Sequence, residues 1–335
     1  MAKWFKDNGA QNDVVLSTRI RLARNLKSIP FPNKMTPEDA QKVISLVETA
    51  LDEMNYTFTK IDLSSMDKAE KHKLVEQHFI SPNLANSKLL CAAYISEDEN
   101  VSIMVNEEDH IRIQCIFAGK EDKKAYDLIT KLDDYLSERL GYAMHEKYGH
   151  LTSCLTNVGT GMRVSYMLHL PAIVSSGAAE SVFDAVGKLG VTVRGMYGEG
   201  TKSFGNIFQF SNQTTLGRSE TEIINALDET INSIISKENE LKEKLSEQKG
   251  LILEDKIMRS YSILKSARIM QSKEMMERLS DLRFGVNLGI IDNIEYKTLN
   301  EIMIQASPAN ITSDHGITNA FERDVKRAEI IREKL

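Results

Sequence analysis

The sequence has few of the residues that mark fibrous, disulfide-linked or low-complexity proteins. Its 335 residues include only 3 cysteines, 6 prolines and 18 glycines. So little proline and glycine excludes a collagen-like or linker-like chain. The three cysteines (Cys91, Cys115 and Cys154) are widely spaced and form no CxxC pair. This pattern excludes a disulfide framework and a CxxC-type zinc site, and it favours a reducing compartment.

Long apolar runs and an excess of positive charge are also lacking. No uninterrupted apolar segment is long enough to span a bilayer, and residues 1–15 contain no apolar run typical of a signal peptide. The 42 basic and 48 acidic residues give a formal net charge of −6. A basic field that attracts nucleic acid or anionic lipid is therefore absent. We expect a cytoplasmic protein that binds neither nucleic acid nor membrane directly and holds any anionic ligand with a local cluster.

The hydrophobic pattern predicts a first domain over residues 1–230. Short runs with strand-like alternation are mixed with segments of helical spacing, and several pairs of runs are separated by turn-like sequences. These hairpin signals favour an α+β fold with a largely antiparallel sheet flanked by helices. We expect strands near residues 14–22, 89–95, 101–105, 106–117, 162–170, 191–193 and 206–210, and helices from Thr36 and over 125–140.

Residues 231–335 are predicted to form a second, all-helical domain. A helix is expected to begin at the capping box of Ser219 and Glu222 and to end near Gly250. Its apolar stripe over residues 224–245 fits either a helix packed into the core or a dimer contact. Further breaks are expected near Gly285, Gly289 and Pro308.

Five arginines fall on predicted strands or at their ends. In residues 106–117, alternation would place Arg112 on one face together with Glu108, His110 and Gln114. Guanidinium groups gathered on one sheet face repel each other, and their forked donors suit phosphate oxygens. The pattern therefore indicates a nucleoside triphosphate, although half-exposed strands with scattered salt bridges would alternate in the same way. The five are Arg19, Arg21, Arg112, Arg163 and Arg194.

The usual nucleotide-binding signatures are missing. The sequence contains no GxxxxGK[ST] loop, no protein-kinase motif set and no GxGxxG after a strand. On glycine content alone, residues 195–205 predict only a flexible loop. If ATP binds, arginine side chains must do what a glycine-rich phosphate loop does in other proteins.

Four segments, taken in order, resemble the catalytic domain of the phosphagen (guanidino) kinases, and within that superfamily the bacterial protein-arginine kinases. They are LSTRIRLARN at 16–25, NEEDHIR at 106–112, CLTNVGTGMR at 154–163 and RGMYGEGT at 194–201. The resemblance implies that Glu108 and Glu199 are the catalytic carboxylates and that Cys154 is the reactive cysteine. It implies that ATP contacts Ser17, Thr18, Arg19, Ile20, Arg21, His78, Arg112, Arg163, Val164, Ser165, Tyr166, Met167, Arg194, Gly195, Met196, Tyr197, Gly198 and Glu199.

Two of these assignments have ordinary alternatives. His78 could be a surface histidine, and Cys154 could be a small apolar side chain that fills space. The residue after this cysteine, commonly proline in phosphagen kinases, is Leu155. This departure weakens the expectation that the cysteine is tuned as in the enzymes that act on small molecules.

Near the end of the sequence, residues 323–328 read RDVKRA. They resemble the phosphoarginine-binding motif of the protein-arginine kinases, which implies an allosteric site at Arg323, Asp324 and Arg327. On a helix the two arginines would be neighbours four residues apart, a like-charge pair that an anion could bridge. An ordinary charged helix would have the same sequence.

The resemblance implies a protein-arginine kinase that uses ATP, with Mg²⁺ carried by the nucleotide. The small-molecule kinases have a helical domain before the first motif, which here begins near residue 16, so we expect a site open to a protein side chain. The implied partners are a stress-response repressor as substrate, a zinc-containing activator protein, a Clp-type ATPase-protease and a second copy of the chain. The alternatives are a kinase for a free guanidino metabolite and a catalytically idle phosphoarginine reader.

Overall fold

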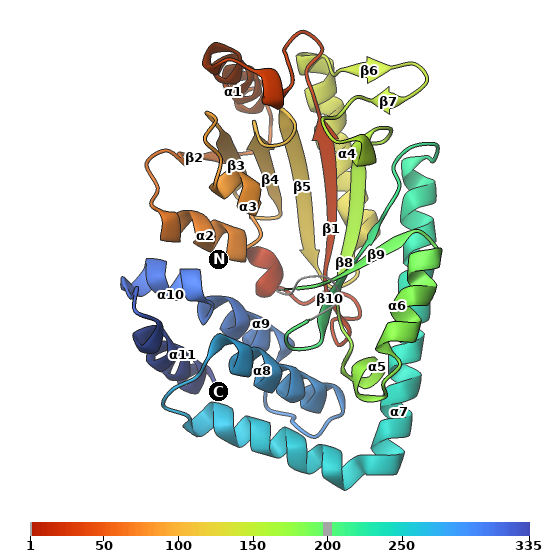
Figure 1. Cartoon of the computed structure of the whole chain (residues 1–335), viewed down its shortest axis with the longest axis vertical. Helices are drawn as coiled ribbons and strands as arrows, with labels where there is room; N and C mark the ends of the chain where they lie inside the picture. Colours follow the sequence, from red (N-terminus) through yellow and green to blue (C-terminus); the bar gives the residue numbers. More distant parts are fainter. Residues whose placement is uncertain (1, 197–202) are drawn as a thin grey trace.

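One large sheet with helices packed around it forms the fold. The computed structural model describes residues 2–196 and 203–335. The described residues form an eight-stranded sheet in the order β2-β3-β4-β5-β1-β8-β10-β9, and all its paired neighbours are antiparallel (Figure 1). The predicted fold class is confirmed. The strands are β1 (Val15–Arg24), β2 (Phe58–Ile61), β3 (Ala92–Ser96), β4 (Val101–Val105), β5 (Ile111–Ala118), β8 (Met162–His169), β9 (Val191–Gly195) and β10 (Ile207–Asn212), with a separate small hairpin of β6 (Met144–His145) and β7 (Gly149–His150).

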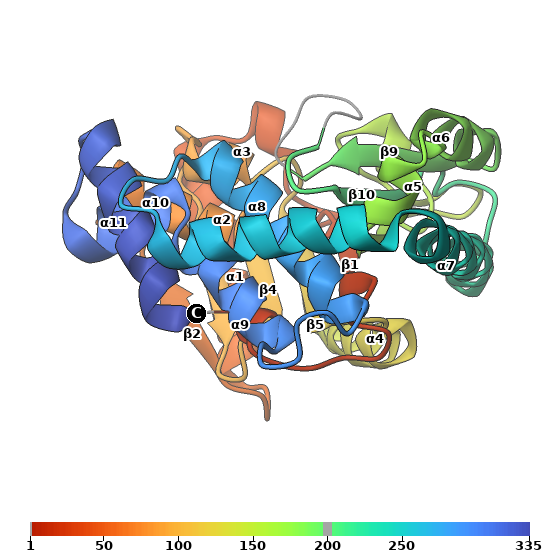
Figure 2. The ribbon, with the colours of Figure 1, turned by 90° about the horizontal axis from the view of Figure 1, so that it is seen from below.

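Helices flank the sheet and fill the lower part of the molecule in Figure 1. The first group joins or covers the strands, whereas α8 to α11 lie together below them, with the second half of α7 running beneath (Figure 2). The α-helices are α1 (Pro37–Asp52), α2 (Lys68–Glu76), α3 (Pro82–Ala85), α4 (Asp122–Leu140), α5 (Pro171–Ser175), α6 (Ala179–Lys188), α7 (Glu220–Ser266), α8 (Ser272–Asn287), α9 (Tyr296–Gln305), α10 (Pro308–His315) and α11 (Ala320–Lys334), and the 3₁₀ helices are η1 (Lys3–Phe5), η2 (Pro32–Lys34) and η3 (Leu155–Asn157).

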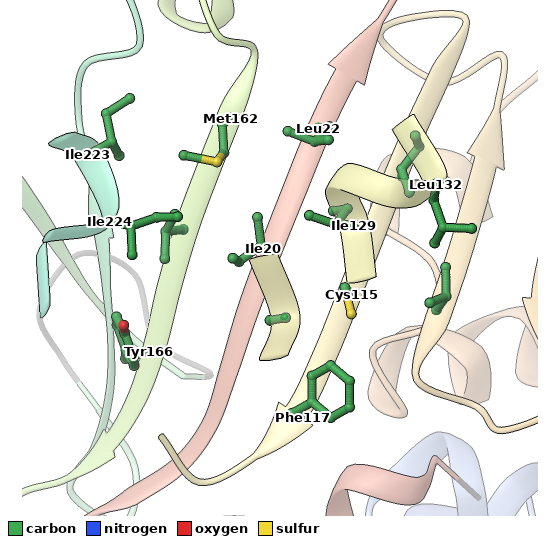
Figure 3. Packing of buried hydrophobic residues seen from close by; sticks show 14 of the residues in the cluster. Ile20, Leu22, Cys115, Phe117, Ile129, Leu132, Met162, Tyr166, Ile223 and Ile224 are labelled. Carbon is green, nitrogen blue, oxygen red and sulfur yellow. The ribbon is translucent and has the colours of Figure 1, made fainter. Parts of the chain in front are cut away.

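One face of the sheet is buried by helices. Alternate residues of the central strands point to this face and pack against α4 and the first half of α7 (Figure 3). Each fully buried aliphatic side chain stabilises the fold by about 1.5–3 kcal/mol relative to exposure. The packed side chains labelled there are Ile20, Leu22, Cys115, Phe117, Ile129, Leu132, Met162, Tyr166, Ile223 and Ile224.

Part of the opposite face packs against the C-terminal helices. Ile116, Met167 and Ile207 join a second hydrophobic cluster that includes side chains of η1, α8 and α9. A register shift between Val15 and Ser17 turns Leu16 into this cluster rather than the first. The arginines of the same face do not belong to the cluster, so the C-terminal helices cover one part of the face and the arginines occupy another.

The helix that begins at Ser219 continues past its expected end. The capping box of Ser219 and Glu222 is present, but α7 extends to Ser266, with a kink at Lys249 (φ −134°, ψ 25°) instead of an end at Gly250. Beyond the kink Ile257 is buried against α8. This packing stabilises the helical conformation past Gly250, although glycine is a poor helix former.

The apolar stripe of this helix proves to be mostly core. Ile224, Ile231 and Ile234 are buried in the first cluster, and Leu241 packs at its edge. Among the expected breaks, Gly289 follows α8 with φ +69°, and Pro308 starts α10. The expectation at Gly285 is wrong: it lies inside α8, where an added Cβ would be 2.5 Å from Ile257 Cγ2. Close helix packing therefore requires this glycine.

The segment 106–117 is a strand only in its second half. Asn106 has φ +60°, and its N–H donates to the carbonyl oxygen of His110, which closes a turn before β5 begins at Ile111. The expectation that Glu108, His110 and Arg112 share a strand face is therefore wrong. The His110 ring is buried, and its Nδ1 accepts from the N–H of Leu26.

No helix formed by the described residues is both long enough and apolar enough to span a bilayer.

Candidate active site

Four arginines from three neighbouring strands lie on the sheet face opposite the helix-covered core. In the antiparallel register Arg21 of β1 is directly opposite Arg163 of β8, and Arg19 is opposite Ser165. Arg112 of β5 is opposite Ala23, the next β1 residue on this face after Arg21. Sequence order alone could not place these side chains together, because β5 and β8 flank β1 from distant parts of the chain.

The arginines lie close enough to repel one another. Burial, together with the charges of Arg163 and Arg112, lowers the pKa of Arg19 to about 10. Burial and then the charges of Arg19, Arg112 and Arg163 also lower the pKa of Arg21. The pKa of Arg163 is lowered by burial and then by Arg194 and Arg112. Arg194 is an exposed residue of β9 opposite Gln209, and its charge acts on Arg163. All five predicted arginines therefore lie on the same sheet face.

The neighbouring groups leave most of this positive charge unneutralised. Arg19 Nη2 donates to Gln209 Oε1 (3.1 Å), and Arg163 Nη2 donates to Ser211 Oγ (2.9 Å), but both acceptors are neutral. Arg21 forms no hydrogen bond or ion pair with any residue that the structure describes, and its Nε is buried. A buried donor without an acceptor beside like charges is costly. A bound polyanion would remove both costs, so the residues present fit ATP.

The loop before β5 contains four polar residues, Asn106 to Asp109, which have two different roles. Two of them hold the loop in place. Asn106 Nδ2 donates to the carbonyl oxygens of Ala40 and Leu90, and Asp109 Oδ1 accepts from Asn25 Nδ2 and from the N–H of Ser153, both at 2.7 Å. The two glutamates between them are left to face the arginines.

Each of these glutamates approaches Arg112 differently. Glu107 is 9% exposed, forms an ion pair with Arg112 Nη1, and accepts a hydrogen bond from Ser81 Oγ (2.6 Å). Glu108 is more open, with 40% of its side chain exposed, and its Oε2 lies 3.3 Å from Arg112 Nη2. Burial raises the pKa of Glu108, and the positive charge of Arg112 opposes this shift. Glu107 thus fixes Arg112, whereas Glu108 remains available to a ligand.

A surface pocket joins these groups. Its lining includes Arg21, Arg112 and Arg163 together with Glu108, Cys154 and Asn157. Because Asp109 binds the N–H of Ser153, the cysteine loop and the Glu108 loop are tied together. Cys154 Sγ lies 3.0 Å from Thr156 Oγ1. The cysteine therefore lines the pocket and is not a filler of the apolar core.

His78 lies beside the arginine face. Its ring packs against Trp4 and Phe5, with centroid distances of 5.3 and 6.3 Å. Burial, followed by the charges of Arg19 and Arg21, lowers its pKa to about 3. The ring is therefore neutral near neutral pH, and the alternative of an ordinary surface histidine does not hold.

The remaining predicted ATP contacts divide between the two faces. Ser17, Ser165 and Met167 alternate with the core residues and lie on the arginine face. Gly195 ends β9, and Met196, which follows it, packs at the edge of the second cluster. Tyr197, Gly198 and Glu199 lie outside the described residues. The side chains of Thr18, Ile20, Val164 and Tyr166 point to the helix-covered face, so only their backbone could reach a ligand on the arginine face.

The C-terminal motif lies on α11, in the group of helices below the sheet. Arg327 is 1% exposed, donates to the carbonyl oxygens of Ala306 (2.7 Å) and Met270 (2.9 Å), and forms an ion pair with Asp324. The predicted like-charge pair with Arg323 is therefore already compensated by protein groups. Arg323, whose Nη1 donates to the carbonyl oxygen of Thr318, stays partly exposed.

Sequence comparison assigns both parts of the chain. Residues 41–241 match the ATP:guanido phosphotransferase C-terminal catalytic domain, and residues 250–335 match the C-terminal domain of protein-arginine kinase McsB. The protein-arginine kinase of Geobacillus sp. (strain WCH70) is 44% identical, with 100% of this chain and 94% of that one covered. The protein-arginine kinase of Bacillus subtilis (strain 168) is 42% identical, with coverage of 100% and 93%.

The chain belongs to the protein-arginine kinase family. Solved structures of phosphagen kinases share its fold. Lombricine kinase has a TM-score of 0.63 at 23% identity and covers 70% of this chain and 68% of its own. The duplicated taurocyamine kinase of Schistosoma mansoni, with bound transition-state-analogue components, has a TM-score of 0.63 at 24% identity, with coverage of 78% and 38%.

Sequence reasoning about this family member missed several polar residues around the arginines. Glu107 lies inside the NEEDHIR segment. Its negative charge beside Glu108 was the one sequence signal that could have indicated a role in the site. Gln209 and Ser211 alternate on β10 as Arg163 and Ser165 do on β8, but their pairing with the arginines depends on strand order. Gln114 was expected on the strand face of Arg112, but no periodicity could have indicated that it donates to the carbonyl oxygen of His78.

Proposed function

We propose that this chain transfers the γ-phosphate of ATP to arginine side chains of proteins. The observation that carries the proposal is the arginine face itself. Mutually repelling guanidinium groups, with Arg21 lacking any partner among the described residues, border a pocket that also exposes the carboxylate of Glu108. Positive charge that the neighbouring carboxylates balance only in part suits a triphosphate, and an exposed carboxylate beside it suits a second, guanidinium-bearing substrate.

The arginines would perform the electrostatic part of catalysis. Phosphoryl transfer passes through a loose transition state whose charge is spread over the equatorial oxygens, so positioning and charge stabilisation supply most of the rate enhancement. Arg19, Arg21, Arg112 and Arg163 project from rigid strands, so their charges are placed before ATP arrives. Little reorganisation is then needed during the reaction.

Glu108 would hold the substrate guanidinium and accept its proton. A guanidinium nitrogen has a pKa above about 12 and no free lone pair, so a proton must leave as the N–P bond forms and the bond from the γ-phosphorus to the ADP oxygen breaks. The raised pKa of Glu108 makes its carboxylate a better proton acceptor than an ordinary glutamate. The resemblance to the phosphagen kinases implies that Glu199 would be the second carboxylate to bind the substrate guanidinium.

The divalent metal would arrive with the nucleotide. The described residues offer no group of three or more histidine, cysteine, aspartate or glutamate side chains that could hold a metal ion by themselves. Mg²⁺ on the phosphates would add positive charge beyond that of the arginines when bound.

Finer assignments remain part of this proposal. The chain would act in the cytoplasm as a dimer, on substrates that include a stress-response repressor, together with a zinc-containing activator and a Clp-type ATPase-protease. Residues 1–230 and 231–335 would be its two domains. Arg323 and Asp324 would contact phosphoarginine, with the buried Arg327 fixing Asp324 through their ion pair.

The experiment offers ATP to the protein with an arginine-rich protein and with free arginine in parallel. Phosphoarginine is measured by phosphorus NMR and by mass spectrometry at neutral or basic pH, because acid hydrolyses the N–P bond. We expect phosphorylation of the protein only, and its loss in Glu108→Gln with ATP affinity changed no more than a few-fold. Phosphorylation of free arginine alone would favour a metabolite kinase. No transfer to either, with phosphoarginine still bound, would favour an idle reader.

A further inference from the structure

A short segment at the end of α2 connects the C-terminal helices to the arginine face. Its first residue, Glu76, caps α10. The carboxylate accepts from the N–H groups of Ala309 and Asn310, each at 2.9 Å, and from Asn310 Nδ2 at 2.8 Å. It also accepts from the hydroxyl of Ser307. A negative charge at a helix N-terminus satisfies free N–H donors and meets the positive end of the helix dipole.

The next residue makes a second contact with the same helix. Gln77 is buried, and its Nε2 donates to Asn310 Oδ1 at 3.0 Å. Asn310 therefore binds both Glu76 and Gln77, through its amide nitrogen and its amide oxygen respectively. These contacts fix the last residue of α2 and the C-cap that follows it relative to α10.

The third residue of the segment reaches the arginine face. His78 has φ +65°, a conformation that non-glycine residues rarely adopt and that persists where the surroundings enforce it. Its carbonyl oxygen accepts from Gln114 Nε2. Gln114 is directly opposite Arg21 in the register of β5 and β1. The C-terminal helices thus connect to the strand beside Arg21 through three consecutive residues.

The His78 ring lies where a ligand of the arginine face would meet it. The ring is held between the aromatic side chains of η1 and the charges of Arg19 and Arg21, and its Nδ1 is buried with no partner among the described residues. Trp4, which packs on this ring, is the only tryptophan of the sequence. Its fluorescence therefore reports on the position of His78.

We propose that Glu76 is a positioning residue for ATP, through which α10 of the C-terminal region holds His78 at the edge of the nucleotide site. The inference rests on the proposed ATP site. Without the cap, the backbone at His78 would relax from its left-handed conformation, and the ring would leave its place beside Arg19 and Arg21.

The test compares Glu76→Gln with a matched control at the same helix pair. Gln keeps the shape of the side chain but loses the charge, and its NH₂ group would face the N–H donors of α10. Asp314→Asn breaks the Lys73–Asp314 ion pair, which also joins α2 to α10 but has no connection to His78. For each variant we would measure the Kd for ATP by calorimetry, the Trp4 emission with and without ATP, kcat at saturating ATP, and the Tm.

We expect Glu76→Gln to raise the Kd for ATP about three- to tenfold, as if only a tenth to a third of the molecules held His78 in place. The Trp4 response to ATP should fall in parallel, while kcat at saturating ATP stays within about twofold, since saturating ligand restores the competent population. Asp314→Asn should leave the Kd and the Trp4 response unchanged.

Two results would overturn the proposal. One is an unchanged Kd and Trp4 response in Glu76→Gln together with a lower Tm, which would make Glu76 a helix cap and nothing more. The other is an equal loss of ATP affinity in Asp314→Asn, which would indicate general loosening of the interface. If Glu76→Gln does not fold, Asn310→Ala gives the same comparison, because it removes two of these contacts and leaves the backbone N–H donors to Glu76. Failure of the wild-type protein to phosphorylate arginine would refute the proposed function but not this ATP-binding comparison.

Discussion

Replacing Arg21 by glutamine should stabilise the ligand-free protein and weaken its binding of ATP. Among the described residues Arg21 has no hydrogen-bond or ion-pair partner to lose, and its Nε is already buried without an acceptor. Its charge lies close to three others, those of Arg19, Arg112 and Arg163, which lower its pKa after the larger effect of burial. Removing the charge therefore removes repulsion and desolvation together.

The magnitude follows from Coulomb's law. Two unit charges about 8 Å apart at an effective dielectric constant of about 20 repel by about 2 kcal/mol. Three such neighbours, screened by salt at a partly open face and offset by Glu107, leave a net gain of about 1–2 kcal/mol. This would raise the Tm by about 2–4 °C for each kcal/mol in a domain of ordinary size. The lost charge-assisted contacts to phosphate, worth about 1.5–3 kcal/mol, should weaken ATP binding by about 10- to 100-fold.

Thermal unfolding without and with ATP tests both the expected gain in stability and the expected loss of ATP affinity. Without ATP the variant should melt above the wild type, and the difference should shrink as salt is added. At an ATP concentration of about 100 times the wild-type Kd, the wild type gains about 2.7 kcal/mol and the variant only about 0.4–1.4 kcal/mol. The Tm difference should therefore vanish if ATP binding is weakened about tenfold and reverse if it is weakened about 100-fold. Arg24→Gln is the contrast on the same strand: Arg24 is buried and paired with Asp133, so its loss should lower the Tm in both conditions. A ligand-free Arg21→Gln protein that melts below the wild type would refute the reasoning.

Three further predictions concern other charged groups. Glu107→Gln should free Arg112 and raise the KM for ATP several-fold in steady-state assays, and an unchanged KM would show that the ion pair positions nothing. Burial raises the pKa of Glu238 to about 7, so its contribution to stability is present below the ordinary pKa of 4.5 and is lost as pH rises through 7. The free energy of unfolding should therefore fall by about 1 kcal/mol between pH 6 and pH 8, and denaturant titrations of Glu238→Gln should show no such fall. Arg327→Ala should destabilise the protein by about 3–5 kcal/mol because it breaks a buried network of hydrogen bonds and an ion pair. Arg323→Ala should leave the Tm unchanged and weaken phosphoarginine binding in calorimetry. Equal losses of Tm in the two variants would show that both arginines have only a structural role.

The local signals that were predicted correctly all depend on residues close in sequence. The helix start at Thr36, the capping box of Ser219, the break near Pro308 and the alternation along β1 are short-range patterns, and the structure contains each of them. The errors came from packing that local patterns do not contain. Glycine at 250 did not end α7, and the turn at Asn106 replaced half of an expected strand.

The order of amino acids alone determined which strands carry arginine and which four segments resemble a guanidino kinase, because alternation and motif spacing are properties of the chain itself. Only the tertiary structure decided that Arg21 and Arg163 are opposite each other, that Glu107 neutralises Arg112 while Glu108 stays open, and that Arg327 is buried instead of exposed. These outcomes depend on strand order and on contacts between residues tens to hundreds of positions apart, and electrostatic interactions depend on distance in space and not on distance along the chain.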